Sequence, residues 1–173
     1  MLIFLVGYMG CGKSTIGRKL SKKLSMPLFD MDKVIEEREG MPVVEIFAQK
    51  GEQEFREMER ELLSELIEQG ESAIISTGGG LPLWFDNMER MNGAGTAVYL
   101  SRSVDNIISR MSQRGRDKRP RIRGLNDEEL KEFMESDLST RLPFYNKASF
   151  VIDAESLADK KIVKLIIKKA GLA

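Results

Sequence analysis

The residues from Gly7 to Thr15 carry the strongest chemical signal in the chain. They read Gly-Tyr-Met-Gly-Cys-Gly-Lys-Ser-Thr, and an apolar run over residues 2–6 precedes them. A strand before such a loop and a helix after it would turn several backbone N–H groups into one concavity at a helix N-terminus. Lys13 could then reach the terminal phosphates of a polyphosphate, and the Ser14 hydroxyl could coordinate Mg²⁺. The loop therefore predicts a polyphosphate site.

Two carboxylates follow the second apolar segment. Residues 28–32 read Leu-Phe-Asp-Met-Asp and predict a short strand, on which alternation places Asp30 and Asp32 on the same side. Ligands of open α/β sheets bind beyond the carboxyl ends of the strands, so both side chains would lie near the phosphate loop. The alternative is that Asp32 only begins the following helix as its N-cap. The chain has no histidine, so we expect a general base to be a carboxylate.

Arg56 lies just off the apolar stripe of a predicted helix that runs from Gly51 to about Gln69. The stripe consists of Phe55, Met58, Leu62 and Leu66. From the pattern alone, Arg56 is best interpreted as a solvated residue that pairs with Glu52 or Glu59 on the same helix.

Three consecutive glycines, Gly78 to Gly80, follow the predicted strand over residues 73–77. No Cβ screens the backbone N–H groups there, so a substrate could come close to them. The alternative is a flexible connection, but flexibility beside a phosphate loop would serve the fold poorly.

A basic segment follows between residues 110 and 124, where seven side chains are lysine or arginine. Its glycines and its proline argue against a continuous helix, and we predict a mobile lid over residues 112–125 that closes on a polyanion. A nucleic-acid patch is the rival interpretation, but the segment lacks aromatic side chains for base stacking.

The overall composition indicates a single domain over residues 1–173, long enough to bury a core. Acidic and basic residues balance at 27 each, so the bulk charge does not indicate nucleic acid or a membrane surface as a partner. One cysteine, no signal-peptide pattern and no apolar run of about 20 residues lead us to expect a cytoplasmic protein without a membrane span. The absence of an obvious apolar patch favours a monomer.

Five predicted strands alternate with helices along the chain. We expect the strands at residues 2–6, 28–32, 73–77, 96–100 and 149–153, and the helices at 14–24, 33–39, 43–50, 51–69, 83–91, 101–111, 126–141 and 158–169. Pro143 is expected to stop the helix before it. This alternation predicts an α/β fold with a parallel sheet covered on both faces, and the loop after the first strand selects its P-loop branch.

The loop alone does not separate a kinase from a nucleotide switch. A GTPase switch carries an Asn-Lys-x-Asp element, and residues 146–149 read Asn-Lys-Ala-Ser, without the aspartate. A small-molecule kinase needs an acceptor pocket, a base and a lid that excludes water, and the segments above could supply all three.

Several spaced elements together resemble the shikimate kinase family. They are the loop at residues 7–15, Asp30-x-Asp32, Ile46-Phe47, Gly51-Glu52-x-x-Phe55-Arg56, Gly78-Gly79-Gly80, Arg119-Pro120 and Arg141-x-Pro143-x-Tyr145. The resemblance spans residues 3–153. It implies a three-layer, nucleoside-monophosphate-kinase-like P-loop fold with strand order 2-3-1-4-5, and ATP-dependent phosphorylation of the 3-hydroxyl of shikimate with Mg²⁺.

The resemblance also implies roles for individual residues. Asp32 would be the base, Lys13 and Arg119 would contact the transferring phosphate, and Ser14 and Asp30 would hold Mg²⁺. The nucleotide would contact Gly10, Cys11, Gly12, Lys13, Ser14, Thr15, Arg110, Arg114 and Arg119. The acceptor would contact Asp32, Arg56, Gly78, Gly79, Gly80, Arg141, Phe47 and Phe55. Half of these residues lie in or beside a substrate-binding helical segment over residues 33–61. A forked guanidinium matches a carboxylate bidentately, which suits Arg56 and Arg141.

One position departs from the family, whose lid commonly continues Arg-Pro-Leu-Leu where this chain has Arg119-Pro120-Arg121-Ile122. Four lid arginines therefore compete for the phosphate role, namely Arg116, Arg119, Arg121 and Arg123. Three other functions stay open: a gluconate-type kinase, an adenylate-kinase-like enzyme, and a regulatory protein whose ATP hydrolysis drives lid closure.

Overall fold

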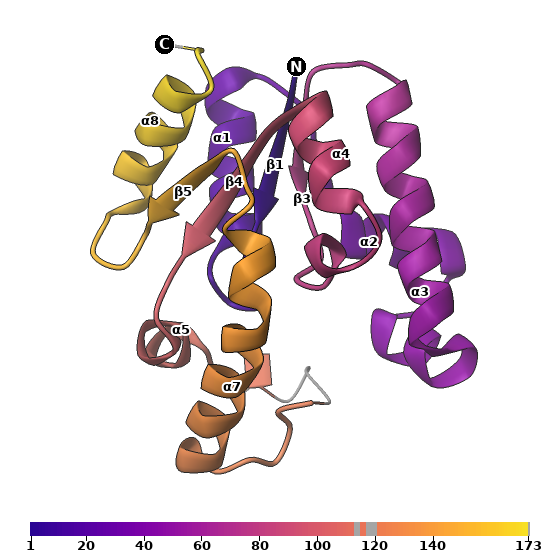
Figure 1. Cartoon of the computed structure of the whole chain (residues 1–173), viewed down its shortest axis with the longest axis vertical. Coiled ribbons are helices and arrows are strands. Elements are labelled where there is room, and N and C mark those ends of the chain that lie inside the picture. Colours follow the sequence, from indigo (N-terminus) through magenta and orange to yellow (C-terminus); the bar gives the residue numbers. More distant parts are fainter. Residues whose placement is uncertain (113–114, 117–120, 173) are drawn as a thin grey trace.

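A five-stranded parallel sheet with strand order β2-β3-β1-β4-β5 forms the centre of the structure, which confirms the predicted order (Figure 1). The computed structural model describes residues 1–112, 115–116 and 121–172. Its elements are β1 (Leu2–Val6), α1 (Lys13–Leu24), β2 (Leu28–Asp30), α2 (Met31–Glu39), α3 (Val43–Glu68), β3 (Ala73–Ser76), the 3₁₀ helix η1 (Leu81–Leu83), α4 (Asn87–Ala94), β4 (Gly95–Ser101), α5 (Val104–Arg110), α7 (Asp127–Tyr145), β5 (Phe150–Asp153) and α8 (Asp159–Lys169).

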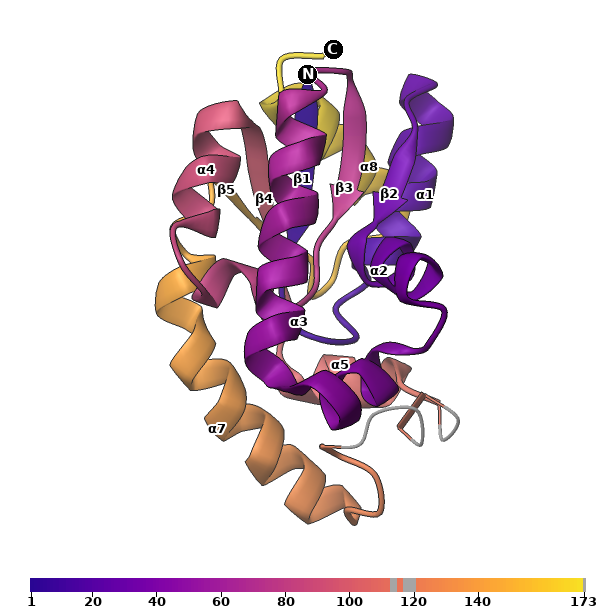
Figure 2. The ribbon, with the colours of Figure 1, turned by 90° about the vertical axis from the view of Figure 1, so that its right-hand side faces the viewer.

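The central strand β1 is buried along its whole length, between β3 and β4. Such a position requires a continuous apolar run, because both faces of the strand are covered. Helices α1 and α8 cover one face of the sheet and α3 and α4 the other (Figures 1 and 2), so the sheet is the middle of three layers. Among the described residues, no helix is both long and apolar enough to cross a membrane.

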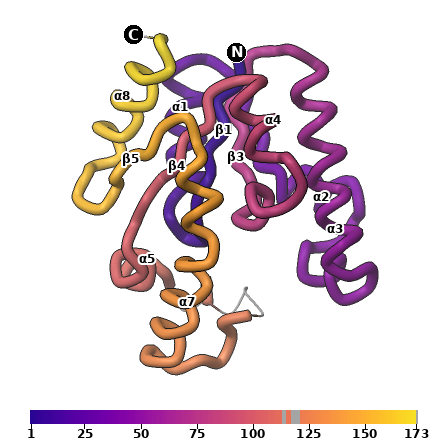
Figure 3. Tube along the Cα trace, in the orientation of Figure 1, coloured from indigo at the N-terminus to yellow at the C-terminus, as the bar shows by residue number. Residues whose placement is uncertain are grey.

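The carboxyl ends of three neighbouring strands lie at one edge of the sheet. Ser76 at the end of β3 is in register with Leu5 of β1 and with Asp30 of β2. Helices α5 and α7 extend beyond this edge, whereas β1 begins and α8 ends at the opposite side of the molecule (Figure 3). The phosphate loop, Asp30 and the glycine run therefore meet where a parallel sheet binds its ligands.

The second strand is shorter than predicted, and the placement of Asp32 on it is wrong. β2 ends at Asp30, and α2 begins at Met31. Met31 and Ile35 are both buried, at the four-residue spacing of a helix face, so burial favours helix from Met31 onward. Asp30 is the N-cap residue, and Asp32 lies in the first turn of α2.

The two helices predicted over residues 43–50 and 51–69 are parts of α3, which bends between them (Figure 2). The bend is at Gly51, whose φ of 87° and ψ of 170° are not helical. A positive φ is readily adopted by glycine alone, so the predicted boundary residue is also the structural one.

The prediction that Pro143 ends its helix is wrong, because α7 continues through it to Tyr145. A proline removes one backbone hydrogen bond and crowds the preceding turn. Contacts beyond Pro143 offset this effect: Tyr145 is buried, and its hydroxyl donates to the Gly79 carbonyl at 2.7 Å. The helix predicted over residues 83–91 is instead divided into η1 and α4.

Candidate active site

The phosphate loop has the geometry of an anion site. Gly10 and Gly12 have φ values of 77° and 106°, which turn the backbone into the start of α1. Within the described residues, no side chain caps the first turn of α1, and no acidic residue lies in it. The backbone N–H groups of the first turn of α1, at the positive end of the helix dipole, are therefore free of side-chain caps from these residues and can bind an anion. Lys13 Nζ donates to the carbonyls of Gly7 at 2.7 Å and Tyr8 at 3.1 Å.

The loop is held from outside by Arg102, which the sequence analysis missed. Arg102 follows β4, is 5 % exposed, and donates from Nε to the Cys11 carbonyl at 2.9 Å. The Cys11 side chain is buried, and its sulfur would lie 2.9 Å from a Cβ placed on Gly7. Cys11 therefore faces a ligand through its backbone. An arginine directly after an apolar strand was the available signal.

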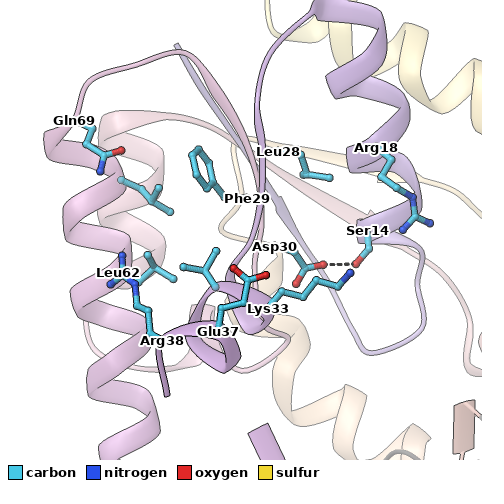
Figure 4. Close-up of a pocket in the computed structure, with 12 residues that line it drawn as sticks. Ser14, Arg18, Leu28, Phe29, Asp30, Lys33, Glu37, Arg38, Leu62 and Gln69 are labelled. Carbon is cyan, nitrogen blue, oxygen red and sulfur yellow. Dashed lines mark hydrogen bonds between the residues drawn. The ribbon is translucent and has the colours of Figure 1, made fainter. Parts of the chain in front are cut away.

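Ser14 and Asp30 lie together, as a magnesium site requires. Ser14 Oγ donates to Asp30 Oδ2 at 2.8 Å (Figure 4). Hydroxyl and carboxylate oxygens are suitable Mg²⁺ ligands, so these residues fit the ion. The described part of the chain contains no cluster of three acidic, histidine or cysteine side chains that could hold a metal by itself. Phosphate oxygens and water would therefore complete the coordination, as is usual for Mg²⁺ with nucleotides.

A cavity of about 350 Å³ gathers the predicted phosphate and carboxylate groups. Its lining includes Gly10, Gly12, Lys13, Ser14, Thr15, Asp30, Asp32, Thr77 and Gly79. A second cavity, of about 510 Å³, lies between β2, α2 and α3 and shares only Ser14 and Asp30 with the first (Figure 4). Apolar and charged side chains both line it, and none of the predicted acceptor residues does. The smaller cavity is therefore the candidate site.

Asp32 has the electrostatic setting of a general base. Burial raises the pKa of its carboxyl group above the ordinary value, and the neighbouring Asp30 raises it further, whereas Lys13 acts in the opposite direction. A carboxylate with a raised pKa accepts a proton more readily at neutral pH, which suits a base that acts on a hydroxyl.

Arg56 forms both ion pairs that its helical spacing allowed. Nη1 lies 2.6 Å from Glu59 Oε2 and Nη2 lies 2.9 Å from Glu52 Oε1. Arg56 is nevertheless 9 % exposed, so the interpretation as a solvated surface residue is wrong. The reason is that α3 packs against the glycine run, which covers this side of the helix.

Three aromatic rings surround the Arg56 guanidinium. Its central carbon lies 5.6 Å from the ring centre of Phe47, 5.4 Å from that of Phe55 and 5.8 Å from that of Trp84. Phe47 and Phe55 also contact each other, with ring centres 4.7 Å apart. These rings attract the cation and limit its hydration. Trp84 was not predicted, and its position after η1 gave no spacing signal.

Glu59 is a third residue, after Arg102 and Trp84, that the sequence analysis left without a functional role. It is fully buried, and its Oε1 has no hydrogen-bond partner among the described residues. Burial raises the pKa of Glu59 to about 7, although Arg56 opposes the shift. The signal was present: Glu59 lies four residues after Phe55 and three before Leu62, within the apolar stripe.

The raised pKa of Glu59 predicts a pH-dependent stability. The folded chain binds this proton more tightly than the unfolded chain, whose carboxyl has a pKa of 4.5. The free energy of unfolding should therefore fall as the pH rises from about 4.5 to about 7, with a contribution approaching about 1.4 kcal/mol per pH unit. Glu59→Gln should lose this slope in urea unfolding, whereas Glu61→Gln, an exposed control on the same helix, should keep it. Equal slopes for Glu59→Gln and the wild type would contradict the prediction.

Glycine is required at two positions of the run, Gly78 and Gly80, because other side chains occupy the space that a Cβ would need there. A Cβ at Gly78 would lie 2.3 Å from Glu59 Oε1 and 3.0 Å from Asp32 Oδ1. A Cβ at Gly80 would lie 2.4 Å from Arg56 Nη2. Gly78 and Gly80 are buried, and Gly79 is partly exposed. The run thus brings Asp32 and Arg56 together around one short piece of backbone.

Arg141 reaches the same backbone from α7. Its Nη1 donates to the Gly79 carbonyl at 3.3 Å, beside the Tyr145 hydroxyl. Its Nε lies 3.1 Å from Asp137 Oδ2. Arg56 and Arg141, 85 positions apart in the sequence, therefore approach the glycine run from different helices.

The predicted lid residues are only partly described. Arg114 and Arg119 lie outside the described residues. Arg110 is exposed at the end of α5, a helix that packs on the phosphate loop through Ile107. Two other lid arginines pair with acidic residues of α7: Arg116 with Asp127, and Arg121 with Asp137.

Comparisons with known proteins agree on one family. The family model described as shikimate kinase matches residues 9–170. The shikimate kinase of Parabacteroides distasonis is 47% identical over 155 residues, which cover 90% of this chain and 88% of that protein. The crystal structure of shikimate kinase from Bacteroides thetaiotaomicron superposes with a TM-score of 0.87 at 40% identity, covering 98% of this chain and 95% of that one. That from Acinetobacter baumannii, in complex with shikimate, gives 0.85 at 31% identity, with 96% and 90% covered. The chain belongs to the shikimate kinase family.

Proposed function

We propose that the chain transfers the γ-phosphoryl group of ATP to the 3-hydroxyl of shikimate, giving shikimate 3-phosphate and ADP. The observation that carries this assignment is that the phosphate loop and Asp32 line the same cavity, of about 350 Å³. The family membership supplies the identity of the acceptor, and a relative has been solved in complex with shikimate.

On the nucleotide side, the loop and the N-terminus of α1 would bind the phosphates. Lys13 Nζ would exchange the carbonyls of Gly7 and Tyr8 for phosphate oxygens. Ser14 would bind Mg²⁺ directly, and Asp30 would support it. The bound ion neutralises negative charge on the phosphates, which lowers the barrier to transfer.

On the acceptor side, Asp32 would accept the proton of the attacking hydroxyl. Its raised pKa and its position in the cavity support this role. Arg56 and Arg141 would bind the carboxylate of shikimate, because two guanidinium groups fix both its charge and its orientation. Gly79 would contribute backbone groups, and Phe47 and Phe55 would form the apolar wall behind Arg56.

The segment over residues 112–125 would act as the lid and exclude water. The role proposed for Arg119 rests on the family resemblance. A monomer in the cytoplasm is part of the same proposal: the single cysteine suits a reducing compartment, and it is buried in the phosphate loop.

An acceptor panel tests the proposed function. ADP release would be measured with shikimate, gluconate, AMP or no acceptor, at saturating ATP and Mg²⁺. We expect strong stimulation by shikimate alone, because the family membership selects this acceptor. AMP has no carboxylate for the two arginines, and gluconate, which has one, tests whether the site also requires the cyclic acceptor. Lys13→Met is the inactive control. Stimulation by gluconate would support a sugar-acid kinase, and an acceptor-independent rate would support a regulatory ATPase.

A further inference from the structure

We propose that Asp137 is a positioning residue of the acceptor site, which fixes the guanidinium of Arg141 and connects it to the phosphate loop through Tyr8. This inference rests on the proposed role of Arg141 as a carboxylate-binding side chain. It concerns a residue on α7 that lines neither of the cavities described above.

Asp137 lies one helical turn before Arg141, and its side chain is only 12% exposed. Its Oδ2 lies 3.1 Å from Arg141 Nε, and its Oδ1 accepts a hydrogen bond of 3.3 Å from Arg141 Nη2. The carboxylate thus lies along one edge of the guanidinium. A second edge is held by the Gly79 carbonyl, to which Nη1 donates. The 3.1 Å approach of Nε to Oδ2 is an ion-pair contact without a hydrogen bond, so one hydrogen bond on each edge, from Nη2 and from Nη1, restricts the orientation of the planar group.

Tyr8 joins this arrangement from the phosphate loop. Its hydroxyl donates to Asp137 Oδ2 at 2.7 Å, and its ring centre lies 5.4 Å from the central carbon of the Arg141 guanidinium. Burial raises the pKa of the Tyr8 hydroxyl, and the hydrogen bond to Asp137 adds to the shift. Tyr8 therefore remains a hydrogen-bond donor at physiological pH. The same residue of the loop orients Asp137 and faces Arg141.

Arg121, at the position where this chain departs from its family, also reaches Asp137. Its Nη2 lies 3.5 Å from Asp137 Oδ1, and its central carbon lies 5.3 Å from the ring centre of Phe133. The Arg121 side chain is 59% exposed, so its own contribution should be small. The contacts with Asp137 and Phe133 nevertheless direct the Arg121 side chain toward α7. The next residue, Ile122, is buried in the core.

Two opposite effects of Asp137 on the acceptor must be compared. Its negative charge repels the acceptor carboxylate, whereas its contacts hold Arg141 ready for binding. Arg141 offsets the charge of Asp137, the exposed Arg121 adds little, and the Tyr8 hydroxyl donates to it. The repulsion is therefore largely cancelled, and the net effect of Asp137 on acceptor binding is set by its preorganisation of Arg141. Removal of the Asp137 charge should weaken acceptor binding.

The test uses Asp137→Asn, which keeps the size of the side chain and an acceptor for the Tyr8 hydroxyl. The KM for shikimate should rise about tenfold, the scale of one hydrogen bond to a charged group. The kcat and the KM for ATP should change less than twofold, because the asparagine oxygen still accepts from the Tyr8 hydroxyl of the phosphate loop and Asp32 is not altered. Glu132→Gln removes the same charge from an exposed position of α7, and it should leave kcat and both KM values unchanged. Thermal melting would monitor folding, and Asp137→Glu, which keeps the charge, should give a smaller rise if asparagine lowers the Tm.

Arg141→Ala and the double variant separate this inference from the proposed function. If Arg141 binds the carboxylate, Arg141→Ala alone raises the KM for shikimate, and adding Asp137→Asn to it has no further effect. A raised KM in Arg141→Ala with an unchanged KM in Asp137→Asn would overturn only the inference. A similar loss of kcat from Asp137→Asn in both backgrounds would also overturn it, in favour of a structural role. An unchanged KM in Arg141→Ala would refute the proposed role of Arg141 itself.

Discussion

Asp32→Asn is expected to lower kcat for shikimate phosphorylation by about 10³-fold, within the range typical of a lost general base. The asparagine keeps the size of the side chain but accepts no proton at neutral pH. The affinity for ATP should stay within a few-fold of the wild type, because Asp32 contacts the acceptor in the proposed mechanism. Steady-state kinetics and nucleotide titration would measure the two quantities separately.

Asp30→Asn is the matched control, because it removes the neighbouring carboxylate that pairs with Ser14. Its activity should depend more steeply on Mg²⁺ and recover in part at high Mg²⁺ concentration. The loss in Asp32→Asn should not recover. A strong loss of ATP affinity in Asp32→Asn would count against its role as the base.

Arg56→Ala is expected to raise the KM for shikimate by about 100-fold, because it removes the buried cation that we propose binds the acceptor carboxylate. The substitution also leaves Glu59 buried without its cation, so the Tm should fall. Arg56→Lys separates the two effects: it keeps a positive charge near Glu59 but loses the planar fork. The KM in Arg56→Lys should therefore still rise, by about tenfold, with a smaller change in Tm.

Arg60→Ala provides the control on the same helix, where the side chain is half exposed and lies over Phe85. Its KM for shikimate should match that of the wild type. A KM unchanged in Arg56→Ala, measured on folded protein, would exclude Arg56 from the acceptor site.

The phosphate loop was predictable because its function depends on local sequence. Glycines at fixed positions, a preceding apolar strand and a following helix are all consecutive in the chain, and the structure confirms each of them. The strand order was implied by the family resemblance. The phosphate loop could be predicted from one continuous segment, and the strand order from an ordered set of motifs along the chain.

Features that depend on packing between distant segments were harder to predict. The surroundings of Arg56 depend on the glycine run, which begins more than 20 residues later in the chain. The burial of Glu59 has the same cause, and a search for charges within the apolar stripe would have detected it. Helix propensity alone suggested an end at Pro143, but the Tyr145 contact with Gly79 decided the outcome. Asp137 is one of several acidic residues on α7, and its four-residue spacing to Arg141 was a signal that the sequence analysis did not use.

The ring that packs against Arg56 from η1 has a practical consequence. Trp84 is the only tryptophan of the chain, and it lies 5.8 Å from the guanidinium carbon. Indole emission responds to nearby charge, so the tryptophan fluorescence of the protein has a single source next to Arg56, the proposed partner of the acceptor carboxylate. Titrations can therefore test acceptor binding without a label, because Trp84 does not line the cavity that contains the phosphate loop.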